Sequence, residues 1–167
     1  VIITGIIEEE EMGKGAHIVR RKSMAHSSVE NVRTALAGVT DLNPYRYDMH
    51  VNFPGGTPVD GPSAGLAIAV SMYSALKSVA VAPDTAFTGE VSIRGEICAV
   101  GGIDQKIRAA ADVGLSKVYI PQANWQDRYA AEKIHVMPVA ALSDVLALLD
   151  PPATMPVKVA TQAAIDR

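Results

Sequence analysis

Residues 54–79 read PGGTPVDGPSAGLAIAVSMYSALKSV, a glycine- and proline-rich stretch that runs directly into the longest apolar segment of the chain. Clustered glycine and proline predict a loop over Pro54-Gly55-Gly56-Thr57-Pro58. Alanine, leucine, isoleucine and valine dominate from Pro62 to Val79, and charges are few. Because a helix that is apolar nearly all round is a buried one, we expect a core helix here, entered from the loop.

Strands and helices are mixed on both sides of this segment. β-branched and apolar runs predict strands at 1–7, 17–21, 48–53, 81–88, 91–93, 96–100, 117–120 and 135–137. Amphipathic runs with caps or terminal glycines predict further helices at 27–37, 103–113, 122–133 and 141–149. This mixture predicts an α/β or α+β domain over residues 1–150, followed by a C-terminal tail at 151–167.

Size and composition narrow the functional classes. The 167 residues fit one compact domain with its own core. A net charge of −3 and an aromatic content of 5% argue against a basic or stacking surface for nucleic acid. Cys98 is the one cysteine, so the sequence offers neither a disulfide framework nor a cysteine-based metal site. This usage suits a reducing, cytoplasmic compartment.

The start of the chain bears on its organisation. No apolar run reaches the roughly 18 residues that span a bilayer, and no signal peptide is visible. The chain begins at Val1 inside a predicted strand. We therefore expect it to be part of a longer protein, whose upstream segment could hold an anchor or a further domain.

Ser63 stands in the sharpest local pattern, Asp60-Gly61-Pro62-Ser63-Ala64-Gly65. Its small neighbours would let a substrate backbone approach the hydroxyl closely. The free N–H groups at the start of the next helix carry partial positive charge and can stabilise the oxyanion of a tetrahedral intermediate. The structural alternative is that Ser63 only caps the helix after a proline turn. The pattern is not the nucleophile elbow, because Pro62 precedes the serine.

A serine nucleophile needs a base. The four histidines are His17, His26, His50 and His135, and none forms a recognisable triad pattern, although His50 leads into the loop. Lysine can serve instead, and Lys106 follows Gly101-Gly102 in an alanine-rich helix. As a base it needs a pKa well below the usual value of about 10.4. Apolar burial and a nearby helix N-terminus act in that direction. The alternative is a solvated surface lysine.

Taken together, the motifs resemble the proteolytic domain of Lon proteases over about residues 1–149, most densely from Asp48 to Pro121. The matching series, in order, is Pro54-Gly55-Gly56-Thr57-Pro58-Val59-Asp60-Gly61-Pro62-Ser63-Ala64-Gly65, Thr88-Gly89-Glu90-Val91-Ser92-Ile93-Arg94-Gly95-Glu96, Val100-Gly101-Gly102-Ile103 and Lys106. Several linked motifs in order are far more specific than any one of them.

The resemblance implies a role for each matching residue. Ser63 is the nucleophile of a Ser-Lys dyad and Lys106 its general base, 43 positions later. Thr88 orients the lysine amine by a hydrogen bond, and Asp60 has a regulatory or positioning role. The resemblance also implies that Glu90 lines the site. From the chemistry of the loop, we expect backbone N–H groups near Gly61 and Ser63 to hold the oxyanion.

Two departures refine the resemblance. Asp104 stands where many bacterial members have a second lysine, which leaves Lys106 without a rival base. The Pro-Gly-Gly loop is one residue shorter than in the common soluble type. Together with Glu8 to Glu11 and Arg20-Arg21-Lys22, this indicates the B-type or a related Lon-like branch.

The resemblance also implies a fold and an assembly. The expected fold is ribosomal-protein-S5-domain-2-like, with a mixed central sheet and flanking helices. Family members act on unfolded or damaged polypeptides, form a six-membered ring and join this domain to an AAA+ ATPase. No Gly-x-x-x-x-Gly-Lys-[Ser/Thr] motif occurs in the chain, so we expect no cofactor in it, and ATP only in an absent ATPase domain. Some related branches carry a membrane tether in segments that are also absent here.

Two other functions remain open from the sequence. One is a Lon-like domain without peptidase activity that serves in assembly or binding. Such relatives usually lose the serine or the lysine, and Ser63 and Lys106 are both present here. The other is a phosphate-binding enzyme with residues 54–65 as a glycine-rich cradle, which lacks a lysine-serine pair inside the loop.

Overall fold

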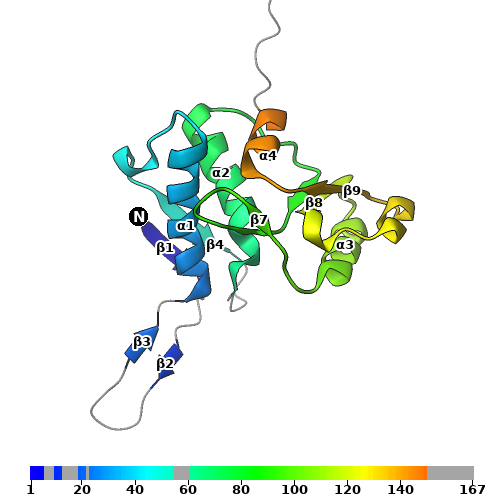
Figure 1. Ribbon diagram of the computed structural model, residues 1–167, viewed down its shortest axis with the longest axis horizontal. Coiled ribbons are helices and arrows are strands. Elements are labelled where there is room, and N and C mark those ends of the chain that lie inside the picture. The colour runs from blue at the N-terminus through cyan, green and yellow to red at the C-terminus, as the bar shows by residue number, and fades with distance from the viewer. Residues whose placement is uncertain (6–9, 13–18, 22, 55–60, 150–167) are drawn as a thin grey trace, which may run out of the picture.

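The computed structural model describes residues 1–5, 10–12, 19–21, 23–54 and 61–149 (Figure 1). Its helices and strands alternate along the chain, which confirms the expected mixed α/β class. The α-helices are α1 (Met24–Val39), α2 (Gly65–Lys77), α3 (Ile103–Asp112) and α4 (Leu142–Leu149). Short 3-10 helices are η1 (Pro44–Arg46), η2 (Pro62–Ala64), η3 (Gln122–Asn124) and η4 (Asp127–Ala131). The predicted tail at 151–167 and Asp60 lie outside the described residues.

The described strands form four small sheets and not the single mixed central sheet that we expected. The parallel pairs are β1 (Ile2–Gly5) with β4 (His50–Phe53), and β5 (Thr85–Phe87) with β8 (Lys117–Pro121) and then β9 (His135–Val139). The antiparallel pairs are β2 (Glu10–Met12) with β3 (Val19–Arg21), and β6 (Glu90–Val91) with β7 (Ile97–Cys98). Both pairing modes occur as predicted, but hydrophobic patterning does not specify which strands become neighbours.

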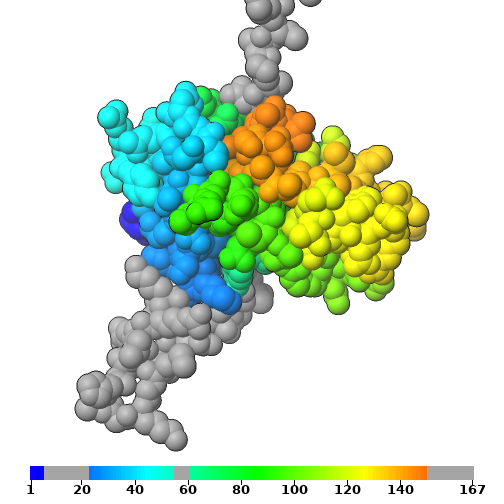
Figure 2. Space-filling model, in the orientation of Figure 1, coloured from blue at the N-terminus to red at the C-terminus, as the bar shows by residue number. Residues whose placement is uncertain are grey.

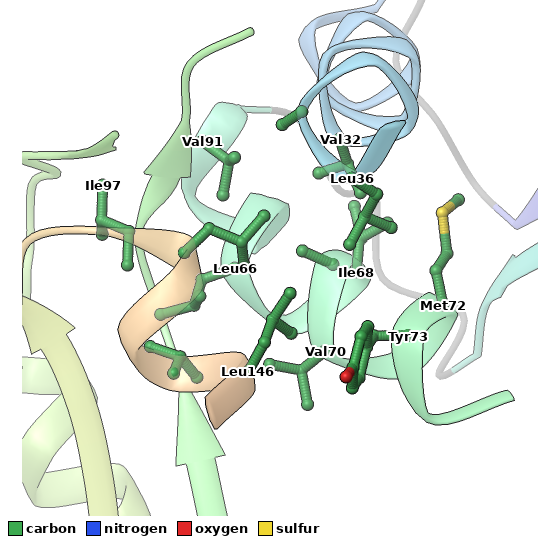
Figure 3. Close-up of a cluster of buried hydrophobic side chains, with 14 of the residues drawn as sticks. Val32, Leu36, Leu66, Ile68, Val70, Met72, Tyr73, Val91, Ile97 and Leu146 are labelled. Atoms are coloured by element: carbon green, nitrogen blue, oxygen red, sulfur yellow. The ribbon is translucent and has the colours of Figure 1, made fainter. Parts of the chain in front are cut away.

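Helix α2 lies at the centre of the larger core, as its apolar sequence predicts. Leu66 and Ala69 are fully buried, and Ile68, Val70 and Met72 nearly so. Helix α1 packs against α2, and α4 also contacts it. Figure 3 shows Val32 and Leu36 of α1 with Ile68 of α2, and Leu146 of α4 near Val70, in one continuous cluster. Burial on several sides explains why α2 has no polar stripe.

A second, smaller core lies between α3 and the β8–β9 strands. Ile103, Ile107 and Ala110 form the buried face of α3. They meet Val118 and Ile120 of β8, Val136 of β9 and the ring of Tyr129 from η4. The residues around η3 and η4, yellow in Figure 2, cover this core at the end of the molecule away from α1. The second core therefore holds α3 against the three-stranded sheet.

Several predicted element boundaries were wrong. Helix α1 begins at Met24 because Ser23 caps it, its Oγ accepting from the N–H of His26 at 3.1 Å, and it runs through Gly38 to Val39. The strand predicted at 81–88 covers only Thr85–Phe87. The helix predicted at 122–133 is two 3-10 turns, since Trp125 and Gln126 have extended backbones. Side chains from these turns bind other parts of the chain, and such tertiary contacts outweigh weak helix propensity.

Candidate active site

A cavity of about 520 Å³ opens between the start of α2, the end of β5 and one face of α3. Ser63, Thr88 and Lys106 are its polar lining side chains. The rest of its wall is small or apolar, with Ala64, Ala67, Ala86, Phe87, Ala109, Ala110, Val113, Leu115 and Val118. The structure thus brings together three of the six residues singled out in the sequence, at a hollow whose remaining wall is small or apolar.

Ser63 lies in η2, directly before α2, and it does not cap either helix. The residue at the cap position is Gly61 for η2 and Ala64 for α2, and neither helix has a side-chain cap. The structural alternative for Ser63, an N-cap, is therefore wrong. Its backbone carbonyl is held instead, accepting from the N–H of Gly89 at 2.9 Å and from the hydroxyl of Thr88 at 3.3 Å.

Gly65 allows the chain after β5 to lie directly on the start of α2. A Cβ at this position would stand 3.0 Å from the backbone N of Val91 and 3.2 Å from the carbonyl oxygen of Gly89. In the same place the N–H of Leu66 donates to the Gly89 carbonyl at 2.9 Å. The absence of a side chain at Gly65 thus allows residues 88–91 to pack against the serine turn.

Lys106 projects from the cavity face of α3, which it shares with Ala109, Ala110 and Val113. These positions are spaced three and four apart, so they lie on one side of a helix. The helix begins after Gly102, whose φ of 70° is one that glycine adopts readily, and the Lys106 N–H donates to the Gly102 carbonyl at 3.1 Å. The Lys106 Nζ donates to Thr88 Oγ1 at 3.2 Å.

Burial lowers the pKa of Lys106 from its ordinary value. Desolvation is the cause, because the low-dielectric surroundings disfavour the ammonium form. No carboxylate is paired with Lys106 among the residues that the structure describes. The alternative of a solvated surface lysine is therefore wrong. A partly buried amine of lowered pKa, held by a hydroxyl, has the properties of a general base.

Thr88 connects the two candidate catalytic residues. Its side chain accepts from the lysine amine and donates to the Ser63 carbonyl, and it is 7% exposed. Its own N–H donates to the carbonyl of Tyr119 in β8 at 3.0 Å. The predicted contact between Thr88 and the lysine amine is present. It joins α3 to the serine turn through one buried hydroxyl.

The remaining predicted residues lie elsewhere. Glu90 pairs with Cys98 across β6 and β7 and is not among the described residues that line the cavity. Cys98 is half-buried, and burial, followed by the nearby charges of Glu90 and Glu96, raises the pKa of its thiol. His50 is exposed, its ring lies 2.8 Å from the Thr4 hydroxyl, and it does not line this cavity.

Three side chains near the start of α3 were not singled out in the sequence. Asn124 of η3 binds the backbone of Val100. Arg128 and Tyr129 of η4 bind the carboxylate of Asp104. These bonds, first that of Tyr129 and then that of Arg128, lower the pKa of Asp104. No local motif marks these residues, because their partners lie 24 or 25 positions away.

A second hollow, of about 600 Å³, runs between β4 and α2. Its lining includes Met49, Phe53, Ile68 and Met72, and it shares Ala64 and Ala67 with the cavity at Ser63.

The described residues contain no group of three or more His, Cys, Asp or Glu side chains that could hold a metal ion. Among the described helices, none has the length and apolarity needed to cross a bilayer.

Comparison with known proteins defines the class of domain. Residues 4–149 match the model of the Lon protease (S16) C-terminal proteolytic domain. The chain belongs to this family.

Two individual relatives support the same family assignment. The chain is 44% identical over 153 residues to Lon protease 2 of Bacillus subtilis (strain 168), an alignment that covers 90% of the chain and 28% of that protein. It is 38% identical over 146 residues to the archaeal Lon protease of Halobacterium salinarum, covering 83% of the chain and 21% of that protein. The chain therefore spans about a quarter of the length of these relatives, and it is their proteolytic part that it resembles.

Proposed function

We propose that this domain is a serine endopeptidase in which Ser63 is the nucleophile and Lys106 the general base. The observation that carries the proposal is the shared cavity, where a lysine of lowered pKa is bound to Thr88 and Thr88 is bound to the serine turn. Apolar surroundings favour the neutral amine that a base requires. Membership of a family of proteolytic domains supports the same reaction class.

The reaction follows from these groups. The Ser63 Oγ attacks the carbonyl carbon of the peptide bond while the neutral Lys106 amine accepts the hydroxyl proton. The oxyanion is stabilised by backbone N–H groups near Gly61 and Ser63. When the C–N bond breaks, the Lys106 ammonium returns its proton to the leaving amine, and an acyl-enzyme remains. Lys106 then takes a proton from water as that water attacks the ester carbonyl. When the C–Oγ bond breaks, the ammonium returns this proton to the Ser63 Oγ, which releases the second product and restores both groups.

Two further residues have supporting roles in the proposal. Asp60, next to Gly61 in the sequence, is outside the described residues; we assign it a regulatory or positioning role towards Lys106. Glu90 stands on the strand that directly follows Thr88 and Gly89 but does not line the cavity, so we assign it an indirect role, through the position of that strand. Of the six residues, Ser63 and Lys106 carry the chemistry and Thr88 orients the amine.

The activity of the whole protein is also a proposal. We infer that the substrates are unfolded or damaged polypeptides in the cytoplasm, delivered by an AAA+ ATPase outside residues 1–167, and that the active sites face the inside of a homo-hexameric ring. The support is family membership and the small fraction of the relatives that the chain spans, 28% and 21%. A membrane tether, where one exists, belongs to those other segments.

The test is peptide hydrolysis by the full-length protein and its variants. Ser63→Ala and Lys106→Ala are each expected to lower kcat by about 10³-fold or more, because both groups act in every turnover. Ser71→Ala, at an exposed position of α2, and Lys133→Ala, at an exposed turn, are the matched controls and should keep wild-type activity. Activity that survives Ser63→Ala or Lys106→Ala would rule out the dyad.

The pH dependence tests the role of the lysine separately. If Lys106 must be neutral, kcat should rise from weakly acidic to mildly alkaline pH, since more of the amine is then deprotonated. A profile that falls over this range would indicate a protonated lysine and a different mechanism. Hydrolysis that is absent from wild type and from all variants would favour the assembly or binding module instead.

A further inference from the structure

The two ends of the segment that leads into α3 are held by side chains from η3 and η4. At the first end, the Asn124 amide binds both backbone groups of Val100: the Val100 N–H donates to Oδ1 at 2.9 Å, and Nδ2 donates to the Val100 carbonyl at 3.0 Å. Two bonds from one side-chain amide define both the position and the orientation of this peptide unit. Asn124 is only partly exposed, so water competes weakly for these bonds.

At the second end, the Asp104 carboxylate in the first turn of α3 is bound by η4. The Tyr129 hydroxyl donates to Oδ1 at 2.7 Å, and Arg128 Nη2 lies 2.8 Å from both carboxylate oxygens. Tyr129 is 3% exposed and its ring belongs to the core that contains Ile103 and Ile107. The Arg128 side chain is 55% exposed, and exposed ion pairs contribute little. Tyr129 is therefore the stronger of the two contacts.

Between these ends lie Gly101 and Gly102, the most permissive backbone that a helix could begin from. Without the bonds at Val100 and Asp104, the first turn of α3 could move relative to the serine turn. Asp104 is two positions before Lys106, which corresponds to about 200° around a helix. The carboxylate is thus held on one side of α3, while the lysine extends from the other side into the cavity.

We propose that Asn124 and Tyr129 are positioning residues for the catalytic lysine: they fasten the start of α3 so that the Lys106 amine stays within reach of Thr88 and shielded from water. The inference rests on the function proposed above, since it assigns these residues to the same site. It adds η3 and η4 to that site, and it gives a purpose to the Asp104 carboxylate, which both Tyr129 and Arg128 bind.

Loosening the start of α3 is expected to raise the pKa of Lys106. Burial is what lowers the pKa of Lys106. A first turn that moves outward admits water to the amine, and the pKa rises towards the ordinary lysine value. Asp104 is close to Arg128 and Arg108, and substituting Tyr129 or Asn124 removes none of these three charged groups. Tyr129→Phe removes only the hydroxyl whose bond is the first cause of the lowered Asp104 pKa. A higher lysine pKa requires a higher pH for the same fraction of active base.

The test compares Tyr129→Phe and Asn124→Ala with wild type in the full-length protein. Each variant is expected to lower kcat about 5- to 20-fold near pH 7 with KM within about twofold, because misplacement of a reacting group costs rate and not substrate affinity. The rise of kcat with pH should move about half a unit or more to higher pH, so that the deficit shrinks in alkaline solution. Tyr45→Phe is the matched control, since it removes a tyrosine hydroxyl bonded to Thr34 at 2.9 Å on α1.

A second measurement does not depend on hydrolysis. The rate at which an amine-specific acylating reagent labels Lys106 is followed against pH by peptide mass spectrometry. In Tyr129→Phe and Asn124→Ala, the midpoint of labelling should move to higher pH than in wild type and Tyr45→Phe. Unchanged midpoints, or a kcat deficit equal at every pH, would overturn the positioning role, even where Ser63→Ala is inactive. If Ser63→Ala keeps its activity while the labelling midpoints shift, only the proposed reaction is overturned and the positioning role stands.

Discussion

Replacing Thr88 by valine tests the connection between the lysine and the serine turn. Valine keeps the shape of threonine and replaces the hydroxyl with a methyl group; that hydroxyl accepts from Lys106 Nζ at 3.2 Å and donates to the Ser63 carbonyl at 3.3 Å. The Ser63 carbonyl keeps its bond from the Gly89 N–H at 2.9 Å. The main loss is therefore at the lysine, which stays partly buried without its partner.

The size of the effect follows from these contacts. One long hydrogen bond to the amine and one to a carbonyl, at a residue that is 7% exposed, correspond to a loss of about 1–2 kcal/mol of unfolding free energy. For a domain of this size that lowers Tm by about 2–8 °C. Because the amine loses the hydroxyl that holds it in the cavity, kcat for peptide hydrolysis should fall about 10- to 100-fold.

The assay is steady-state peptide hydrolysis by the full-length protein, with thermal unfolding of the same samples. Thr88→Ser restores the hydroxyl and should recover most of the lost kcat. Thr34→Val is the matched control on the exposed side of α1, where the lost hydroxyl bonds the Glu30 carbonyl at 3.2 Å. If Thr88→Val keeps wild-type kcat, the reasoning that Thr88 orients Lys106 is refuted.

Two other substitutions have defined outcomes. Lys106→Met should stabilise the fold by up to about 1 kcal/mol near neutral pH while abolishing hydrolysis, because it removes an amine whose charged form burial disfavours. The folded-state pKa of Lys106 lies below its unfolded-state value. The gain in stability of Lys106→Met over wild type is therefore largest below the folded-state pKa and disappears as pH rises past the unfolded-state value. Equal Tm differences at neutral and strongly alkaline pH would contradict this reasoning. Gly65→Ala should cost about 1–3 kcal/mol, since its Cβ would lie 3.0 Å from the Val91 backbone N. Gly38→Ala, in the last turn of α1 with open space around the added Cβ, is its control, and equal Tm values for the two variants would show that the close approach at Gly65 is unimportant.

The prediction of helix α2 shows what local patterning can determine. A long apolar run has no polar side to present to water, so its burial follows wherever its neighbours lie. The 122–133 segment shows the opposite case. Its sequence is compatible with one helix, but in the folded protein Asn124 is hydrogen-bonded to Val100, and Tyr129 to Asp104. Those partners are distant in sequence, so no local pattern could indicate that the segment would break into two 3-10 turns.

For the site, the sequence by itself determined which residues were candidates, because Ser63, Thr88 and Lys106 stand in motifs whose order and spacing resemble those of the Lon proteolytic domain. It left the N-cap and surface-lysine alternatives open. Only the tertiary structure decided these, by placing the serine turn, the end of β5 and the face of α3 around one cavity. The physical reason is that the pKa of Lys106 and the surroundings of Ser63 depend on burial and on contacts with Thr88, 18 and 25 positions away along the chain. Short-range sequence preferences do not encode such contacts.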